Sequence, residues 1–241
     1  MRHSAARCSP KRASKGKKPG VRPPAMRFTL QAAHEHLVRA ARRTMPPLAD
    51  ALENLGPVWF PSRSRDAGPA SVLARSVVGQ QLSVAAASTI WRRIQEAAAA
   101  DGTPMPVFFR SERLDALRVC GVSSAKAKTL IAIGAFCRDG LLDRTVMRRL
   151  GPEKRRASLL VLPGVGPWTC DMLEIFYFRS PDIWPMGDAA AMGLFRRYLE
   201  APSGTNHPLA QAEPFRPFRS ILSLALWRLV STGLKRGPVT R

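Results

Sequence analysis

The sequence predicts an all-α protein, and three observations support this fold class. No segment shows a sustained alternation of apolar and polar residues, which is the pattern of a half-buried strand. Apolar residues instead recur with helical spacing, as in 28–43 and 215–234. Proline, glycine and serine stand where these periodic segments begin or end. A chain of 241 residues is long enough for one domain, or two small ones, with a substantial core.

The chain is strongly basic, with 38 Lys and Arg against 17 Asp and Glu, a formal net charge of +21. Nine of these cations and no acid fall within residues 1–27, so the remainder still carries +12. Such a balance favours a polyanionic partner, most commonly nucleic acid. The alternative is a solvated basic surface with a basic tail.

Residues 1–25 contain almost nothing apolar, and we expect them to be a disordered basic tail. Met26 follows as a candidate true first residue of a helical domain over 26–241. The tail is a candidate for weak contacts with DNA phosphates, and its composition leaves nuclear or organellar targeting open. If the protein is bacterial, we expect it in the cytoplasm, associated with the nucleoid. No apolar stretch reaches 18 residues, so no membrane partner is expected.

The first helix is expected over 28–43, and the prolines that follow end it before a short helix at 48–55. A loop over 56–68 leads to a helix at 70–81, which Pro69 begins.

A tight turn at Gly79–Ser83 precedes the next helix, 84–100, for which Ser83 is the predicted N-cap. Gln80 and Gln81 in this turn are polar groups that could read base edges. A solvated loop is an equally good interpretation of the two glutamines.

Ser111 and Ser123 are predicted N-caps for helices over 112–118 and 124–138. Lys126 and Lys128 lie near the start of the second helix, where the helix dipole disfavours cations. Their position suggests an external anion, with a solvated face as the alternative. Further helices are expected over 146–150, 153–160, 167–178, 189–199 and 215–234, with a polar loop over 200–213.

The segment Leu162–Thr169 reads LPGVGPWT and is too tightly punctuated for a strand. Pro163 restricts φ, and Gly164 and Gly166 permit a backbone that a Cβ would resist. Glycines also leave backbone N–H groups open to a ligand, and at a helix N-terminus such groups attract phosphate. Taken alone, the segment is equally typical of a corner between two helices.

Asp188 stands at the start of the helix expected over 189–199, so an N-cap role is the simplest interpretation. The functional interpretation is a carboxylate directed into a cleft beside the segment Leu162–Thr169, which we call the hairpin. Few other acids occur in this half of the chain, chiefly Asp171, Glu174 and Asp182. The four cysteines contain no C-x-x-C pair, so we expect free thiols in a reducing compartment and no zinc site.

Together these motifs resemble the helix-hairpin-helix DNA glycosylase superfamily, and within it the 3-methyladenine DNA glycosylase II family. The hairpin Leu162–Thr169 is followed by Asp188 twenty-two residues after Gly166. The resemblance continues along the chain and covers about 70–232. Its further motifs are Val78–Ala85, Gly121–Ala127 and Phe218–Trp227.

The resemblance implies a two-lobed helical fold with DNA between the lobes. The first lobe would span about 70–160, and the hairpin lobe 161–241 together with 26–69. The extra N-terminal β-domain of some relatives has no counterpart in this sequence. The iron–sulfur loop of other branches is also not expected, because no cysteine follows Cys170.

The resemblance assigns the catalytic role to Asp188 and base-pocket positions to Trp168, Trp227 and Met172. Relatives that cleave the DNA backbone carry a lysine where this chain has Trp168, and that lysine attacks the sugar as an amine. Hydrolysis without lyase activity is therefore implied. Met172 and Ala189 replace tyrosines of some relatives, which implies a less aromatic pocket.

For DNA binding, the resemblance implies a phosphate grip at Gly164, Val165 and Gly166. It also implies a wedge, Gln81 or Leu82, that fills the space left by a flipped base. Carbonyl groups implied to hold a structural monovalent cation, sodium or potassium, belong to Leu160, Leu162 and Val165. No other cofactor is expected.

The implied function is that of a monofunctional DNA glycosylase, active as a monomer. It would remove alkylated purines from damaged duplex DNA by base flipping and hydrolysis of the N-glycosidic bond, the first step of base excision repair. Two alternatives remain open from the sequence. One is a non-catalytic helix-hairpin-helix DNA-binding protein, and the other is a glycosylase for deaminated or oxidised bases.

Overall fold

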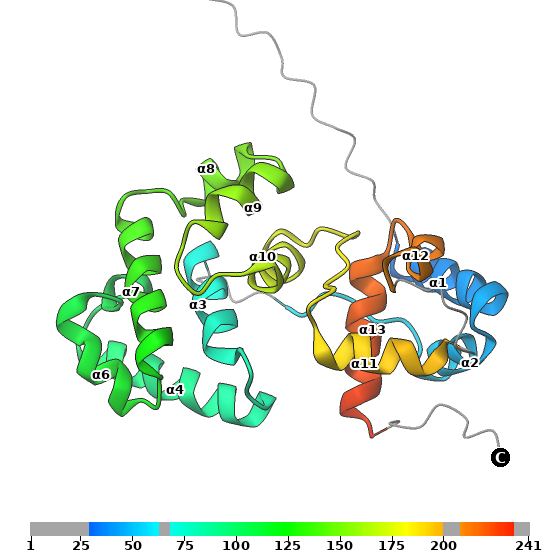
Figure 1. Cartoon of the computed structure of the whole chain (residues 1–241), viewed down its shortest axis with the longest axis horizontal. Coiled ribbons are helices and arrows are strands. Elements are labelled where there is room, and N and C mark those ends of the chain that lie inside the picture. Colours follow the sequence, from blue (N-terminus) through cyan, green and yellow to red (C-terminus); the bar gives the residue numbers. More distant parts are fainter. Residues whose placement is uncertain (1–28, 63–67, 200–207, 234–241) are drawn as a thin grey trace, which may run out of the picture.

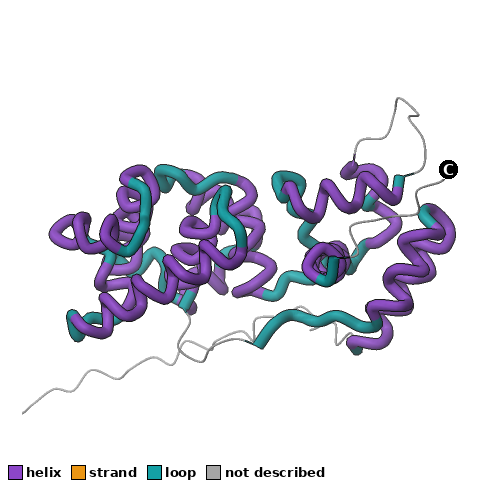
Figure 2. Tube along the Cα trace, turned by 90° about the horizontal axis from the view of Figure 1, so that it is seen from below, coloured by secondary structure: helices purple, strands orange, loops and turns teal. Residues whose placement is uncertain are grey.

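The computed structural model describes residues 29–62, 68–199 and 208–233. All regular secondary structure within these residues is helical, which confirms the predicted fold class (Figures 1 and 2). The predicted basic tail, 1–25, lies outside the described residues. Among the described helices, none combines the length and the apolar character needed to cross a membrane.

Most predicted helices are present with shifted ends, whereas the short helices at Met105–Phe108 and Pro208–Gln211 were not predicted, and the second lies in the expected polar loop 200–213. Those of the first half are α1 Leu30–Thr44, α2 Pro46–Leu55, α3 Pro69–Gly79, α4 Val84–Ala100, α5 Met105–Phe108, α6 Leu114–Val119 and α7 Ser124–Arg138. Those of the second half are α8 Arg144–Arg149, α9 Pro152–Leu160, α10 Pro167–Leu173, α11 Ala189–Tyr198, α12 Pro208–Gln211 and α13 Arg219–Ser231. Shorter turns are 3-10 at Ser111–Arg113 and Glu213–Phe215, and π-helical at Glu174–Phe178.

Local capping explains which helix starts were predicted. Ser83 Oγ accepts a hydrogen bond from the backbone of Ala86 at 3.2 Å, and Ser123 Oγ accepts one from Lys126 at 3.4 Å. Both caps are therefore confirmed. The predicted cap at Ser111 is wrong, because this residue begins a 3-10 turn and α6 starts later without a side-chain cap.

The buried apolar side chains of the described residues form two hydrophobic cores, one in each of two lobes. The first lobe, built from α3 to α10, buries residues such as Leu73, Ile94 and Leu130. The second lobe packs α1 and α2 against α11 and α13, so segments from opposite ends of the chain share one core (Figure 1). Fully burying a leucine such as Leu37 contributes about 1.5–3 kcal/mol.

Helix α10 lies between the two lobes (Figure 1). Leu162, Val165 and Leu173 belong to the core of the first lobe, whereas Met172 and Ile175 belong to that of the second. The first-lobe core therefore continues through the hairpin, past the lobe boundary at residue 160 expected from the sequence. Side chains on α10 consequently contact both lobes.

A buried ion pair joins α9 to the π-helical turn. Arg155 Nε and one terminal nitrogen donate to the two Glu174 carboxylate oxygens at 2.6 and 2.8 Å, and each side chain is only 8% exposed. Ser180 Oγ donates to the same carboxylate at 2.7 Å, and Arg155 also donates to the carbonyl of Leu150 at 2.5 Å. The pair holds the two helical arms of the hairpin together.

Candidate active site

The hairpin loop lies between the end of α9 and the start of α10. Gly164 has φ +75°, a left-handed conformation that side chains rarely adopt, and a Cβ there would overlap Oγ1 of Thr129. Glycine is therefore required at this position by the folded chain itself. The expectation for Gly164 is confirmed.

The second hairpin glycine differs from the first. Gly166 has φ −105° and ψ −179°, an extended conformation open to any residue, and nothing lies within 4 Å of a Cβ built on it. The expectation that its backbone would resist a Cβ is wrong. The space beside Gly166 is open at the start of α10, where a ligand could approach the backbone closely.

Asp188 is the N-cap of α11, as the simplest interpretation predicted. Its Oδ1 accepts hydrogen bonds from the backbone of Ala191 at 2.8 Å and from Trp227 Nε1 at 2.9 Å. Its Oδ2 accepts one from Trp168 Nε1 at 2.9 Å. Helices α10, α11 and α13 thus bring together three residues that the resemblance assigned to the site.

The charge of Asp188 is not neutralised by a described ion pair. Asp171 pairs with Arg156 at 2.6 Å, and Glu174 pairs with Arg155. Burial raises the pKa of the Asp171 carboxyl above its usual range. Asp188, by contrast, is 8% exposed and receives only N–H donors in the described contacts. Such a carboxylate can stabilise a positive charge that forms next to it.

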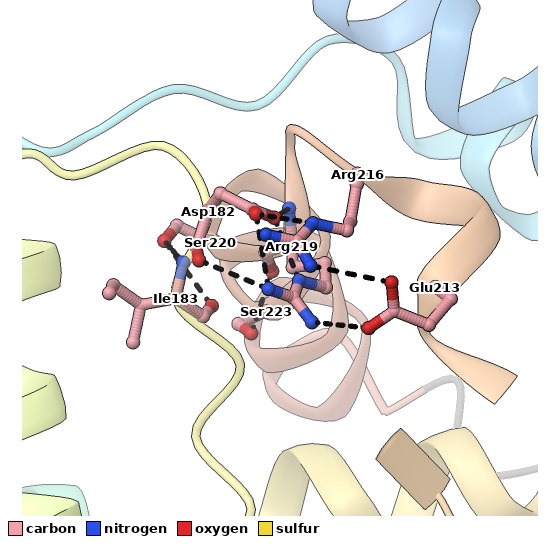
Figure 3. Close-up of polar contacts among 7 residues, drawn as sticks. All are labelled: Asp182, Ile183, Glu213, Arg216, Arg219, Ser220 and Ser223. Carbon is pink, nitrogen blue, oxygen red and sulfur yellow. Dashed lines mark hydrogen bonds and ion pairs between the residues drawn. The ribbon is translucent and has the colours of Figure 1, made fainter. Parts of the chain in front are cut away.

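The loop that leads to Asp188 is fixed to the start of α13 by a second ionic network (Figure 3). Asp182 accepts two hydrogen bonds from the Arg219 guanidinium, at 2.7 and 3.1 Å, and pairs with Arg216 at 3.0 Å. Glu213 pairs with both arginines. Asp182 is therefore engaged in structural ion pairs.

Backbone contacts secure the same loop. Ser220 Oγ accepts the Ile183 N–H at 2.8 Å (Figure 3). The Ser220 N–H donates to the carbonyl of Pro181 at 2.9 Å. Because α13 also carries Trp227, one helix positions both the loop before Asp188 and an indole bound to its carboxylate.

Trp168 and Trp227 are half-buried, and each donates its indole N–H to Asp188. Trp227 stacks on Phe176, with ring centroids 5.6 Å apart and an interplanar angle of 20°. Phe176, on the π-helical turn, is a site residue that sequence reasoning missed. One face of the Trp227 indole is therefore covered from within the protein.

The two positions matching tyrosines of some relatives differ in exposure. Met172 is 4% exposed and packs within the second-lobe core, so it lies beneath the surface. Ala189 is exposed beside Asp188. The small alanine side chain leaves room next to the carboxylate.

The turn between α3 and α4 presents both wedge candidates outward. Gln81 has φ +55° and is exposed, and Leu82 is 40% exposed. Gln80 instead turns inward, and its Nε2 donates to the Gly164 carbonyl at 3.0 Å and to Thr169 Oγ1 at 2.9 Å. The suggestion that Gln80 reads base edges is therefore wrong, whereas that for Gln81 stays a prediction.

Lys126 is also turned toward the protein. Its Nζ donates to the carbonyls of Val78 and Gln80, at 2.8 and 2.7 Å. These carbonyls lie at the end of α3, where the helix dipole favours a cation. The expectation of an external anion at Lys126 is wrong, because the partners are internal carbonyls. Lys128 is exposed.

The predicted cation site consists only of carbonyl oxygens. Leu160 ends α9, where helix carbonyls have no intrahelical donor, and Leu162 O accepts the Val165 N–H at 3.2 Å while keeping a second lone pair. Neutral oxygens of this kind fit a sodium or potassium ion. In the described part of the chain no group of three or more His, Cys, Asp or Glu is arranged to hold a metal. The cation at this loop stays a prediction.

No family model matches the chain, but comparison with known proteins finds similar DNA glycosylases. DNA-3-methyladenine glycosylase 1 of Schizosaccharomyces pombe is 29% identical over 174 residues, covering 70% of this chain and 76% of that protein. The putative DNA-3-methyladenine glycosylase YfjP of Bacillus subtilis is 25% identical over 165 residues, covering 66% of this chain and 58% of that protein.

A solved structure extends the similarity to the fold. The 3-methyladenine DNA glycosylase of S. pombe, in complex with abasic DNA, superposes with a TM-score of 0.71 at 27% identity. The match covers 83% of this chain and 96% of that one. By both sequence and fold, the chain is therefore similar to 3-methyladenine DNA glycosylases of the helix-hairpin-helix fold.

Proposed function

We propose that this protein is a monofunctional DNA glycosylase that removes alkylated purines, of the 3-methyladenine type, from duplex DNA. One observation carries the proposal. Asp188 is a nearly buried carboxylate that receives hydrogen bonds from two indoles and one backbone N–H, and no described cation neutralises it. Removal of the base would be the first step of base excision repair.

The carboxylate acts on the sugar. A duplex hides the glycosidic bond, so the nucleotide must first be flipped out of the stack. As that bond breaks, its electron pair leaves with the base, and the sugar develops oxocarbenium character. Asp188 stabilises this positive charge and orients or deprotonates the water whose oxygen bonds to the anomeric carbon. A purine alkylated at a ring nitrogen is already cationic in DNA and needs little acid catalysis to depart.

Hydrolysis without strand cleavage follows from the residue at position 168. A lyase reaction needs an amine that attacks the sugar and forms a Schiff base. The indole of Trp168 cannot supply one, and its N–H is bound to Asp188. We further propose that the enzyme acts as a monomer without a required cofactor, with a sodium or potassium ion at the hairpin in a structural role.

Incubation with duplexes that each carry one lesion tests the function. Alkali then converts every abasic site into a strand break, whereas breaks before alkali would report lyase activity. We expect release of 3-methyladenine or 7-methylguanine and no break without alkali. Release of only deaminated or oxidised bases would favour that glycosylase class, and binding without any release would favour a non-catalytic DNA-binding protein.

Alanine variants of the two hairpin glycines separate an effect on DNA affinity from an effect on stability. Gly166→Ala should leave thermal stability unchanged, because space for the methyl group is free and φ is ordinary. It should weaken binding to damaged and undamaged duplexes alike, by about tenfold, since phosphate contacts carry no sequence information. Fluorescence anisotropy at fixed salt measures both affinities.

Gly164→Ala is the contrasting variant. It should lower the unfolding temperature, because Gly164 has a φ of +75° and the added methyl group would overlap Thr129.

For the Gly166→Ala variant, wild-type affinity for DNA in a folded protein would argue against close approach of the DNA backbone at this loop.

Trp227 is expected to distinguish charged from neutral bases. Trp227→Phe keeps an aromatic face but loses the N–H donated to Asp188, whereas Trp227→Leu loses both. The release rate of Trp227→Phe divided by that of Trp227→Leu therefore reports what the aromatic face alone contributes. A cation over an aromatic ring gains about 0.5–2 kcal/mol, so this rate ratio should be about twofold to thirtyfold larger for 7-methylguanine than for hypoxanthine.

Single-turnover rates on the two lesions provide this ratio. Circular dichroism must first establish that both variants fold, since leucine could leave a cavity against Phe176. Equal ratios for charged and neutral bases would mean that Trp227 acts through Asp188 and packing alone.

A further inference from the structure

The turn between α3 and α4, residues 80–83, is tied to the hairpin by the Gln80 side chain; we call it the wedge turn. Gln80 Nε2 donates to the carbonyl of Gly164 at 3.0 Å and to Thr169 Oγ1 at 2.9 Å. A carbonyl only accepts hydrogen bonds, so its contact determines which end of the amide is the nitrogen. Both hydrogens of the amide are engaged by the hairpin.

Lys126 holds the same turn from α7. Its Nζ donates to the carbonyls of Val78 and Gln80 at 2.8 and 2.7 Å, and burial lowers its pKa below the usual range. The Gln80 peptide is therefore bound through its carbonyl to Lys126, while the side chain of the same residue is bound to the hairpin.

Helix α7 supports the hairpin as well as the turn. Thr129 lies three residues after Lys126, on the same side of the helix, and its Oγ1 occupies the space beside Gly164. One helix face thus contacts both DNA-binding elements. A displacement of the turn relative to the hairpin would break hydrogen bonds on Gln80, Lys126 or both.

The wedge turn needs such support. Gln81 has φ +55°, a conformation unfavourable for a residue with a Cβ, which persists only where the surroundings hold it. Leu82 next to it is 40% exposed and lines a cavity of about 110 Å³ together with Lys126. The tip of the turn is therefore exposed, whereas its base is anchored by side-chain hydrogen bonds.

We propose that Gln80 and Lys126 are positioning residues that fix the wedge turn relative to the hairpin. A duplex held by its phosphates at Gly166 would then meet Gln81 and Leu82 at a set place in the base stack. The proposal rests on the proposed glycosylase function. Phosphate contacts position a duplex but do not separate its bases, and flipping costs unpairing and unstacking energy. The wedge residues can offset this energy only if the turn that carries them keeps its position when the duplex presses against it.

The test compares a paired with an unpaired lesion. Gln80→Met keeps the length of the side chain and removes both donors. Single-turnover release of 7-methylguanine opposite cytosine should be about tenfold slower than in the wild type. Release of the same lesion opposite an abasic site, where no pairing resists flipping, should stay within about twofold. Lys126→Met should change the two rates in the same way.

Control variants separate positioning from loss of structure. Lys128→Met removes an exposed charge from the same helix and should leave the paired-to-unpaired rate ratio unchanged. Lys126→Arg retains a cationic donor and should recover part of the ratio. Gln80→Glu, which places a carboxylate against the Gly164 carbonyl, replaces Gln80→Met if thermal unfolding shows that the methionine variant does not fold.

The outcomes are distinct. A selective loss on the paired lesion supports the coupling between turn and hairpin. Equal losses on both substrates in folded Gln80 and Lys126 variants, or no loss on either, would overturn it. If the wild-type protein releases the base from neither substrate, the proposed function itself fails, and that result precedes any comparison of variants.

Discussion

Replacement of Asp188 by asparagine is expected to slow base release about a thousandfold. In the proposed mechanism, the substitution removes the negative charge that would stabilise the developing oxocarbenium ion and the base that would receive a proton from water. It changes the shape of the site very little, so affinity for an abasic duplex should stay within a few-fold. Single-turnover release of 7-methylguanine and anisotropy with abasic DNA measure the two quantities.

The hydrogen bonds of Asp188 define the control for this variant. Oδ1 accepts from Ala191 and Trp227, and the amide oxygen of asparagine can accept from both. Because asparagine caps helices as well as aspartate does, thermal stability should change little. The amide nitrogen, however, would face the Trp168 N–H at the place of a 2.9 Å contact, so two donors would oppose each other.

Trp168→Phe removes that opposing donor. If the asparagine variant were inactive only because Trp168 shifts, the double variant Asp188→Asn with Trp168→Phe would recover activity relative to Asp188→Asn. We expect no recovery. Release by Asp188→Asn at a rate near that of the wild type would contradict the catalytic assignment.

The sequence predicted helices best where the signal is local. Helices 84–100 and 124–138 were predicted with the bounds that α4 and α7 have, because each follows a serine whose hydroxyl caps it. The segment after Pro167 was predicted as a single helix to residue 178, but from Glu174 onward it is π-helical. A wider turn rotates the residues after it, so Phe176 was not expected beside Trp227.

The sequence singled out the residues of the candidate site, but it did not predict the contacts between them. Motif resemblance singled out Asp188, Trp168 and Trp227, which are separated by 20 and 39 residues along the chain. That both indoles donate to one carboxylate depends on how α10, α11 and α13 cross. Gln80 and Lys126 resemble solvated polar residues in the sequence, because their partners lie 46 to 89 residues away.

The buried ion pair behind the hairpin gives the largest expected effect on stability. Arg155→Met should lower the free energy of unfolding by about 3–5 kcal/mol, because it leaves the Glu174 carboxylate buried without its cation. For a chain of this size, that corresponds to a fall in unfolding temperature of about 10 °C. Urea unfolding followed by circular dichroism measures the free energy.

An exposed ion pair of the same length is the matched control. Arg92 and Glu96 lie 2.6 Å apart, as do Arg155 and Glu174, but are 62% and 59% exposed. Arg92→Met should therefore cost less than about 1 kcal/mol, because water screens the charges at the surface of α4. Comparison of the two variants separates the effect of burial from that of distance.

Replacing both members of the buried pair should cost less than removing the arginine alone. The double variant Arg155→Met with Glu174→Leu leaves no unpaired charge in the core, and apolar side chains of similar size can fill the space. Its free energy of unfolding should lie within about 2 kcal/mol of the wild type. Because α10 carries Trp168, we expect Arg155→Met to slow the release of 7-methylguanine as well. The double variant should release this base faster than Arg155→Met does. If the double variant is less stable than Arg155→Met, the pair contributes more by its contacts with Ser180 and Leu150 than by mutual compensation of charge.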